Sequence, residues 1–337
     1  MKVPALSSIA GWRKEHPVPG LGKISEGTGP AGMYASILTK EIGSAVSKQL
    51  RRRGGHGSSD RPQLPAPEAL ESRERRVRVD GQKNSEFCAV VHSPVGANAH
   101  GGYLHALTFP LSTEVMTSGS FPLRLLGLIH LKNSVVQLRP VAVNSTIKIR
   151  SRVKEFGTHR RGVTVTILAE IWDESGELAM TDESLYLSKQ ASSSQKESSS
   201  HSAGQNSAAS THPDPREGMR LTARWRLAAD TGRQYAKVSG DANPIHLSAA
   251  SAKLFGLQGS IAHGMYCASR ALGRLAADPS APGEWTVEFG APVLLPATVE
   301  LWRDRSPSGP ERRVRGIGRK ARKNFELVWS PSSEDRQ

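Results

Sequence analysis

The sequence predicts an α+β fold made of two similar halves, each a long helix packed on an antiparallel sheet. Three observations lead to this prediction. An apolar helical pattern is followed by a run of strand patterns, and this succession occurs twice along the chain. Matching residues recur in the same order in both runs. A Ser-rich stretch, too poor in large apolar side chains to form a core, separates the two runs.

The first half is predicted to span residues 71–188. Its helix lies near residues 105–116, and its strands lie near 129–138, 146–155, 162–172 and 178–187. The turn Asp173-Glu174-Ser175-Gly176 between the last two strands is typical of a hairpin.

The second half is predicted to span residues 216–332. Its helix covers about residues 262–277, with Met265, Ala268, Leu272 and Leu275 on one face. Its strands lie near residues 285–289, 298–303, 312–317 and 324–329.

An internal duplication relates the two halves. The segment 140–147 aligns with 292–299, and Pro, Val and Thr recur at the same places. Upstream, Val77 aligns with Trp225 and Phe87 aligns with Tyr235. Several matches in the same order indicate that one unit occurs twice.

Two further segments carry no core pattern. Residues 189–215 are interpreted as a Ser-rich flexible linker, and residues 1–70 as a basic, partly disordered N-terminal extension. Residues 33–50 have a weak amphipathic helical pattern. We interpret the extension as mobile or loosely docked, with peripheral membrane contact as the alternative.

Composition restricts the function classes. The chain of 337 residues has a net charge of +14, which fits anionic partners such as nucleic acid, lipid headgroups, or acidic proteins and cofactors without choosing among them. Only two cysteines occur, Cys88 and Cys267, which indicates a reducing compartment; Cys267 lies in an apolar helical run and is interpreted as core. We expect a cytoplasmic protein, because no apolar run is long enough to span a membrane.

The chemistry is concentrated in residues 239–246 and 261–265. Asp241 and His246 flank a rigid Asn243-Pro244 turn, and together they can activate one water molecule. Gly264 opens an apolar helix, so its free N–H can stabilise a developing negative charge. The alternative interpretation is ordinary turn chemistry, with Asp241 capping a helix and His263 as a structural residue.

The stretch from Tyr235 to His246, the segment Ile261-Ala262-His263-Gly264-Met265 and the later segment 287–293 resemble the MaoC-like (R)-specific enoyl-CoA hydratase family. The resemblance implies a double hot-dog fold, in which each long helix is wrapped by an antiparallel sheet. It also implies that Asp241 and His246 hold the catalytic water and that the Gly264 N–H forms the oxyanion hole. We assign Asn243, His263 and Met265 to substrate binding.

The first half resembles the N-terminal half of actinobacterial double hot-dog 3-hydroxyacyl-thioester dehydratases, through segments 109–111, 116–118 and 121–133. That half carries no catalytic pair. Aligning Phe87 with Tyr235 places Ser93 at the position of Asp241 and Asn98 at that of His246. We therefore expect one active site, with the first half supplying a wall of the acyl tunnel and a pseudo-dimer interface. His130 is interpreted as a core or sheet residue, with lining the site as the alternative.

The expected activity is reversible dehydration of (3R)-hydroxyacyl thioesters to trans-2-enoyl thioesters in fatty-acid metabolism. We expect no metal or redox cofactor; the partners are acyl-CoA or acyl carrier protein, with no nucleic acid, and a homodimer is an open option. Alternatives are a hot-dog thioesterase and a non-catalytic basic binding module. The basic side chains Arg312, Arg313, Arg319 and Arg322 either meet the phosphates or acidic face of the acyl carrier or form a solvated strand face.

Overall fold

The computed structural model describes residues 64–189, 214–305 and 309–332. Most of the predicted N-terminal extension, the amphipathic pattern at 33–50 and nearly all of the predicted linker lie outside the described residues.

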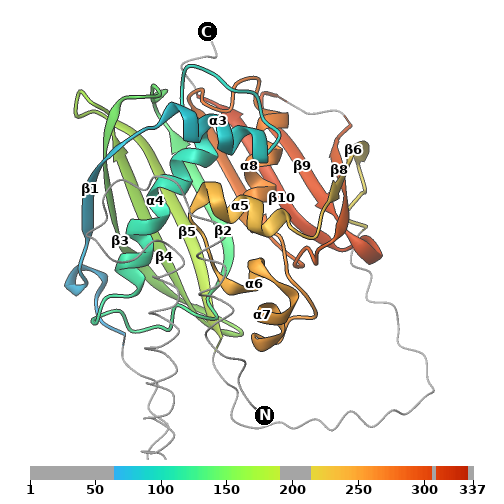
Figure 1. Ribbon diagram of the computed structural model, residues 1–337, viewed down its shortest axis with the longest axis horizontal. Helices are drawn as coiled ribbons and strands as arrows, with labels where there is room; N and C mark the ends of the chain where they lie inside the picture. Colours follow the sequence, from blue (N-terminus) through green and yellow to red (C-terminus); the bar gives the residue numbers. More distant parts are fainter. Residues whose placement is uncertain (1–63, 190–213, 306–308, 333–337) are drawn as a thin grey trace, which may run out of the picture.

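One curved sheet of ten strands organises the described part of the chain (Figure 1). Every neighbouring pair is antiparallel, in the order β1-β3-β4-β5-β2-β7-β10-β9-β8-β6. The strands of the first half are β1 (Arg73–Arg78), β2 (Ile129–Gln137), β3 (Thr146–His159), β4 (Gly162–Trp172) and β5 (Leu178–Lys189). Those of the second half are β6 (Met219–Leu227), β7 (Gly283–Phe289), β8 (Ala297–Asp304), β9 (Arg312–Ile317) and β10 (Lys323–Pro331).

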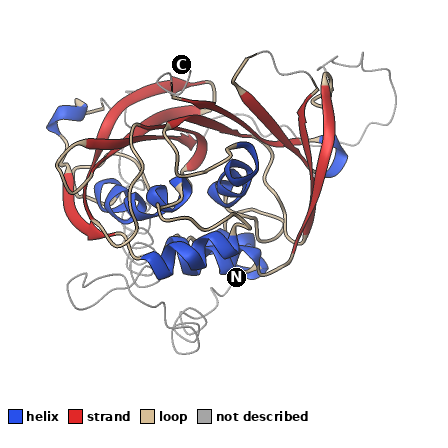
Figure 2. Ribbon diagram, turned by 90° about the horizontal axis from the view of Figure 1, so that it is seen from above, coloured by secondary structure: helices blue, strands red, loops and turns tan. Residues whose placement is uncertain are grey.

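The α-helices lie together on the concave side of this sheet, which wraps around them (Figure 2). They are α3 (Gly81–Val90), α4 (Gly101–Met116), α5 (Thr231–Ser239), α6 (Pro244–Leu247), α7 (Ala249–Leu254) and α8 (Gly264–Leu275). Two short 3-10 turns, η2 (Pro67–Ala69) and η3 (Arg319–Ala321), complete the elements. The predicted fold class, an α+β double hot-dog, is confirmed.

The two halves meet in the middle of the sheet, where β2 pairs with β7 from Lys132–Glu288 to Gln137–Gly283. From one edge to the junction the order is β1-β3-β4-β5-β2, and from the other edge it is the equivalent β6-β8-β9-β10-β7. The junction therefore marks a pseudo-twofold axis. One apolar core extends across the junction and includes residues of both long helices. The first half thus forms the pseudo-dimer interface expected of it.

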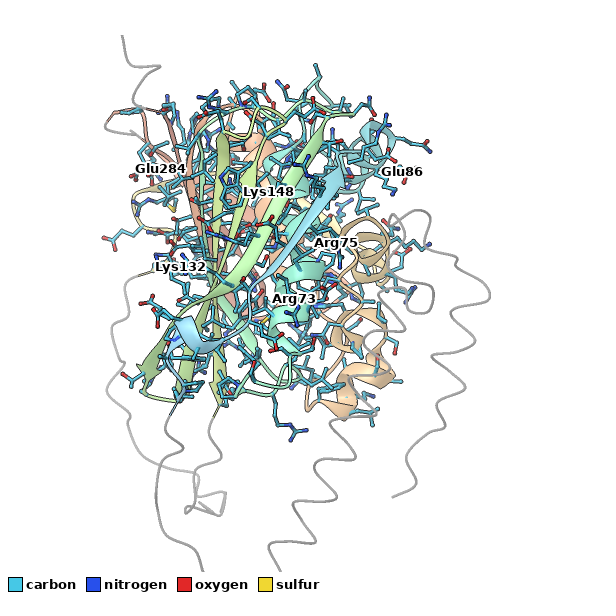
Figure 3. All side chains as sticks on the ribbon, turned by 90° about the vertical axis from the view of Figure 1, so that its left-hand side faces the viewer. Arg73, Arg75, Glu86, Lys132, Lys148 and Glu284 are labelled. Carbon is cyan, nitrogen blue, oxygen red and sulfur yellow. The ribbon has the colours of Figure 1, made fainter. Side chains whose placement is uncertain are left out.

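Alternating burial explains how the strands fit this architecture. In β3, Ile147, Ile149 and Val153 face the helices and are buried, while Lys148 points to the outer face of the sheet (Figure 3). The edge strand β1 carries a row of arginines, and Arg75 pairs with Glu114 of α4 at 3.0 Å. Charged side chains on an edge strand discourage pairing with another chain.

The prediction that Asn98 occupies the position of His246 is wrong. Asn98 forms an isolated β-bridge with Ala142, and the matching bridge in the second half joins Ile261 to Leu294. Asn98 is therefore the counterpart of Ile261. The second half is 14 residues longer between its first and its long helix, and α6 and α7 occupy this insertion. The first half has no segment at all in the place of the one that carries His246.

Candidate active site

Hydrogen bonds between residues close in sequence shape the loop that carries Asp241. Helix α5 ends at Ser239 and is capped by Gly240, whose φ of 76° is left-handed and turns the chain sharply. The Asp241 carboxylate then accepts a hydrogen bond from the Asn243 N–H at 3.1 Å, and the Asn243 side chain accepts one from the Ile245 N–H at 3.3 Å. Asn243 thereby caps α6 and stiffens the turn, as the sequence predicted.

His246 lies one turn later and is held in one tautomer. Its Nδ1 lies 2.8 Å from the carbonyl oxygen of Ile261. A carbonyl only accepts, so Nδ1 carries the proton and Nε2 keeps a lone pair that can take a proton. Burial lowers the pKa of His246, although the Asp241 charge and the Ile261 carbonyl oppose this effect. The ring is therefore a neutral base at physiological pH.

His263 clamps the loop onto the start of α8. Its ring stacks on His246 with 3.6 Å between ring centroids, and its Nε2 donates to the backbone carbonyl of Asp241 at 3.0 Å. Burial, followed by the neighbouring His246, lowers the pKa of His263 to about 3. Since the ring stays neutral and packed, it positions the loop rather than carrying charge.

Asp241, His246 and His263 bring one ligand atom each to within 4.8 Å of one another. A single water molecule can bridge groups at this separation. The residue types also occur in zinc sites, where ring nitrogens lie about 2.0–2.1 Å from the metal. The two imidazole planes are nearly parallel, 24° apart, so their in-plane lone pairs do not converge on one ion. The group therefore fits a water better than a metal.

Gly264 begins α8 directly after His263, and its N–H finds no acceptor among the described residues. The ring of Phe289 lies so close that a Cβ at this position would come within 2.8 Å of Cε1. A free amide at a helix start, carrying the helix dipole, is suited to a negatively charged oxygen.

The equivalent amide of the first half is blocked. Gly101 begins α4 after His100, as Gly264 follows His263, but its N–H donates to the carbonyl of Pro279 at 2.9 Å. The first half thus lacks both the insertion that carries His246 and an open amide. The geometry supports one site per chain.

The first half contributes a wall beside this site. Ala242, next to Asp241, packs against Phe109 of α4 and against Leu125 and Leu126. Symmetrically, Ser93 of the first half lies against Gly273 of α8. Each half therefore rests its first-helix loop on the long helix of the other half.

Two predicted positions lie elsewhere than the water-binding group. Met265 is buried among the main core residues, and no described contact brings it to Asp241. The His130 ring is tilted against that of Phe289, with 5.0 Å between ring centroids, and lies on the concave face of the sheet beside His105 of α4. The importance of Phe289 and of the Ile261 carbonyl was missed, because a backbone acceptor and a ring from a distant strand leave no local signal.

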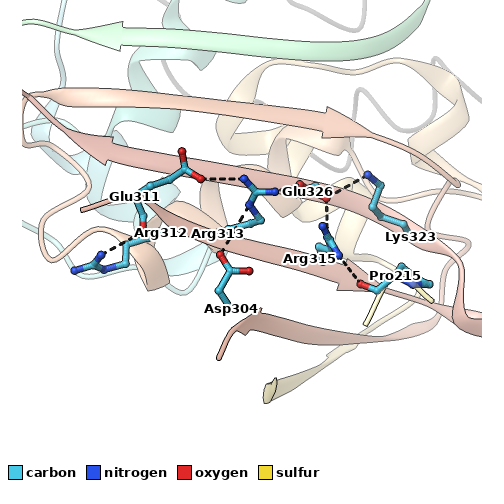
Figure 4. Close-up of polar contacts among 8 residues, drawn as sticks. All are labelled: Pro215, Asp304, Glu311, Arg312, Arg313, Arg315, Lys323 and Glu326. Carbon is cyan, nitrogen blue, oxygen red and sulfur yellow. Dashed lines mark hydrogen bonds and ion pairs between the residues drawn. The ribbon is translucent and has the colours of Figure 1, made fainter. Parts of the chain in front are cut away.

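Arginine side chains on the strands of the second half form ion pairs with neighbouring carboxylates (Figure 4). Arg313 contacts Glu311, Glu326 and Asp304, and Arg315 contacts Glu326 at 2.7 Å. Arg312 donates to the backbone carbonyls of Gly309 and Glu311. Arg319 and Arg322 are exposed on the β9–β10 loop.

The two thiols are buried and free. Burial raises the pKa of Cys88 to about 11 and that of Cys267 to about 12. Neither thiol is therefore activated as a nucleophile. Among the residues with described positions, no helix is long and apolar enough to cross a membrane.

The chain is similar to known proteins in sequence and in fold. The MaoC like domain family matches residues 205–314. The 3-hydroxyacyl-thioester dehydratase X of Mycobacterium tuberculosis is 30% identical over 264 residues, covering 77% of this chain and 89% of that protein. The chain belongs to the MaoC-like dehydratase family. A part of the fatty acid synthase beta subunit TOXC of Cochliobolus carbonum is also similar, 46% identical over 79 residues that cover 22% of this chain and 4% of that protein.

Solved MaoC-like structures share the architecture. The crystal structure of HtdX of Mycobacterium tuberculosis superposes with a TM-score of 0.62 at 26% identity, covering 77% of this chain and 100% of that chain. A MaoC-like dehydratase from Phytophthora capsici gives the same TM-score at 15% identity, covering 80% of this chain and 99% of that one, and shows the common fold alone.

Proposed function

We propose that this MaoC-like protein catalyses the reversible syn hydration of trans-2-enoyl thioesters to (3R)-hydroxyacyl thioesters, in fatty-acid metabolism. The observation that carries the proposal is the convergence of Asp241 and His246 beside the open amide of Gly264. The function printed for the 30% identical relative, a 3-hydroxyacyl-thioester dehydratase, supports the same reaction class.

The catalytic pair acts on one water molecule. The Asp241 carboxylate accepts a hydrogen bond from the water, and the Nε2 lone pair of His246 takes a proton as the water oxygen attacks C3. The proton held by the pair then passes to C2. One water is added across the double bond, its hydroxyl to C3 and its hydrogen to C2, both from the face where the pair lies.

Gly264 stabilises the charge that this attack creates. As the C3–O bond forms, electrons move through C2 toward the thioester carbonyl, whose oxygen becomes negative. The Gly264 N–H donates to that oxygen, and removing one such donor typically costs about 10²–10³ in kcat. His263 bonds the loop that carries Asp241 to the start of α8, and Asn243 caps α6. In this way they position the substrate, Asp241 and His246.

The substrate is an acyl group carried as a thioester by CoA or by an acyl carrier protein, and the reaction as written needs no redox cofactor. The wall formed by Phe109, Leu125 and Leu126 gives the acyl chain an apolar surface on the first half. We place the protein in the cytoplasm.

The two alternatives are less well supported. A thioesterase of this fold needs a carboxylate on the long helix; α8 contains none, and Glu114, the one on α4, is paired with Arg75. A non-catalytic basic binding module needs a broad surface of exposed, unneutralised cations; Arg319 and Arg322 are exposed, whereas Arg313 and Arg315 are paired with acids (Figure 4).

The test is hydration of crotonyl-CoA and longer trans-2-enoyl-CoA esters, followed by loss of the enoyl absorbance and by chiral analysis of the product. We expect turnover with the (3R) alcohol as product. Release of free CoA would indicate a thioesterase. Salt-dependent binding of nucleic acid without turnover would indicate the binding module.

A further inference from the structure

A cluster of polar side chains is buried in the half that lacks the catalytic pair. His105 of α4, Asn133 of β2 and Asp182 of β5 are each at most 5% exposed. His105 Nδ1 lies 2.6 Å from one carboxylate oxygen of Asp182, and the Asn133 amide donates to the other at 2.5 Å. We call these three residues the buried polar cluster.

The catalytic half has apolar side chains at the equivalent positions. His105 is the fifth residue of α4, and the fifth residue of α8 is Ala268. Asp182 pairs with Val135 and Ala169, and its counterpart Leu327 pairs with Val287 and Val314 in the matching strands. Asn133 corresponds in the same way to Trp285.

This difference calls for a physical reason. Burying a carboxylate costs several kcal/mol unless hydrogen bonds compensate, and an apolar core of the same volume is often as stable. The twin half shows that this fold packs well without the cluster. A role tied to the neighbouring site explains the cluster better than stability does.

A continuous line of rings joins the cluster to Gly264. The His130 ring lies parallel to that of His105, with 6.4 Å between centroids. It stacks on Tyr186 at 4.6 Å and contacts Phe289 at 5.0 Å. Phe289 in turn covers the Cα of Gly264. His130 of the first half thus reaches the start of α8 through Phe289 of the second half.

His130 takes part in this line as an uncharged ring. Burial, together with the adjacent His105, lowers its pKa to about 3, against the opposing effects of Asp182 and Asp241. Its Nε2 atom is buried and has no hydrogen-bond partner in the described part of the chain. The ring therefore acts through its packing: it is stacked on Tyr186 and tilted against Phe289.

We propose that His130 is a positioning residue: held by the buried polar cluster, it presses Phe289 against Gly264 and fixes the direction of the amide that stabilises the oxyanion. This inference rests on the proposed hydratase function. An amide donor is effective only if it already points at the place where charge develops, and small displacements are costly.

The experiment compares His130→Ala, His130→Phe and His130→Gln in the full chain, with kcat and KM for crotonyl-CoA and the melting temperature of each. We expect His130→Ala to lower kcat at least tenfold with KM within twofold, since an oxyanion donor acts in the transition state. His130→Phe keeps a flat ring and should recover kcat to within threefold. His130→Gln, which keeps a polar atom without a ring, should not.

Ile149→Ala is the matched control. Ile149 is fully buried on β3 of the same half and lies outside the line of rings. It should lower the melting temperature while kcat per folded molecule stays within twofold of the wild type. A coupled pair adds a second readout: in a Phe289→Leu background, His130→Ala should have no further effect on kcat.

Several results would overturn the proposal. A wild-type kcat in His130→Ala would do so, as would recovery by Gln but not by Phe, which would mean that Nε2 bonds the substrate directly. If His130→Ala does not fold, Phe289→Leu alone decides, and an unchanged kcat contradicts the inference. Absence of turnover in the wild type refutes the proposed function instead, so the two failures are distinguishable.

Discussion

At the scale of single residues, Gly264 carries the tightest constraint in the site. It must leave its N–H open for an oxygen and leave room for the Phe289 ring. A glycine meets both needs, because any Cβ would lie within 2.8 Å of that ring. Both the amide and the ring that holds it therefore depend on this position.

Gly264→Ala should lower kcat at least tenfold, because either the Phe289 ring or the start of α8 must move. Steady-state kinetics with crotonyl-CoA measure the effect. Gly119→Ala is the control, since an added Cβ there meets nothing within 4 Å, and its kcat should not change. An active Gly264→Ala enzyme would show that the amide is not the oxyanion donor.

Local sequence patterns predicted part of this site. The Asn243-Pro244 turn and the glycine at the helix start can be read directly, because each depends on neighbouring residues. The tautomer of His246 cannot be read, since it is set by the backbone carbonyl of Ile261. Phe289 comes from a strand that only the folded sheet brings to Gly264.

At the scale of elements, the second half differs from the first by the insertion that carries α6 and α7. The strand positions were well predicted, and β4 and β9 have the predicted bounds. The alignment of Asn98 with His246 failed because an alignment without gaps passes over an insertion. Only the two isolated bridges reveal it.

The β2–β7 pairing joins the two halves into one sheet, so disrupting it should lower the free energy of unfolding. Thr286 on β7 pairs with both Ser134 and Val328. Thr286→Pro should lower the free energy of unfolding by about 3 kcal/mol or more, since proline removes a ladder bond in a central strand. Thr222→Pro is the comparison, because it lies at a bulge on the edge strand β6 and should cost less. Chemical denaturation measures both; equal losses would contradict a shared central sheet.

At the scale of the whole molecule, buried neutral histidines link stability to pH. Burial lowers the pKa of His100 to about 4 and those of His130 and His263 to about 3, against 6.5 for a free histidine. The unfolded chain therefore binds protons below pH 6.5 that the folded chain does not. The contribution of these three rings to the free energy of unfolding is fully present above pH 6.5 and is lost as the pH falls toward 3–4.

Denaturation between pH 4 and 7 should show this loss, with each histidine contributing about 1.4 kcal/mol per pH unit within its window. His100→Gln removes one of the three groups and should make the decline shallower. A stability that does not change between pH 6.5 and 4.5 would contradict neutral burial of these rings.

The most direct measurement of the central claim is a double-mutant cycle on the catalytic pair. kcat/KM for crotonyl-CoA is compared among the wild type, Asp241→Asn, His246→Ala and the double variant, all checked for folding by circular dichroism. Because the two groups act on one water, each single change should cost about 100-fold or more, and the double variant should lose little beyond either single one. Folded single variants that keep wild-type turnover, or losses that multiply as for independent residues, would contradict the account.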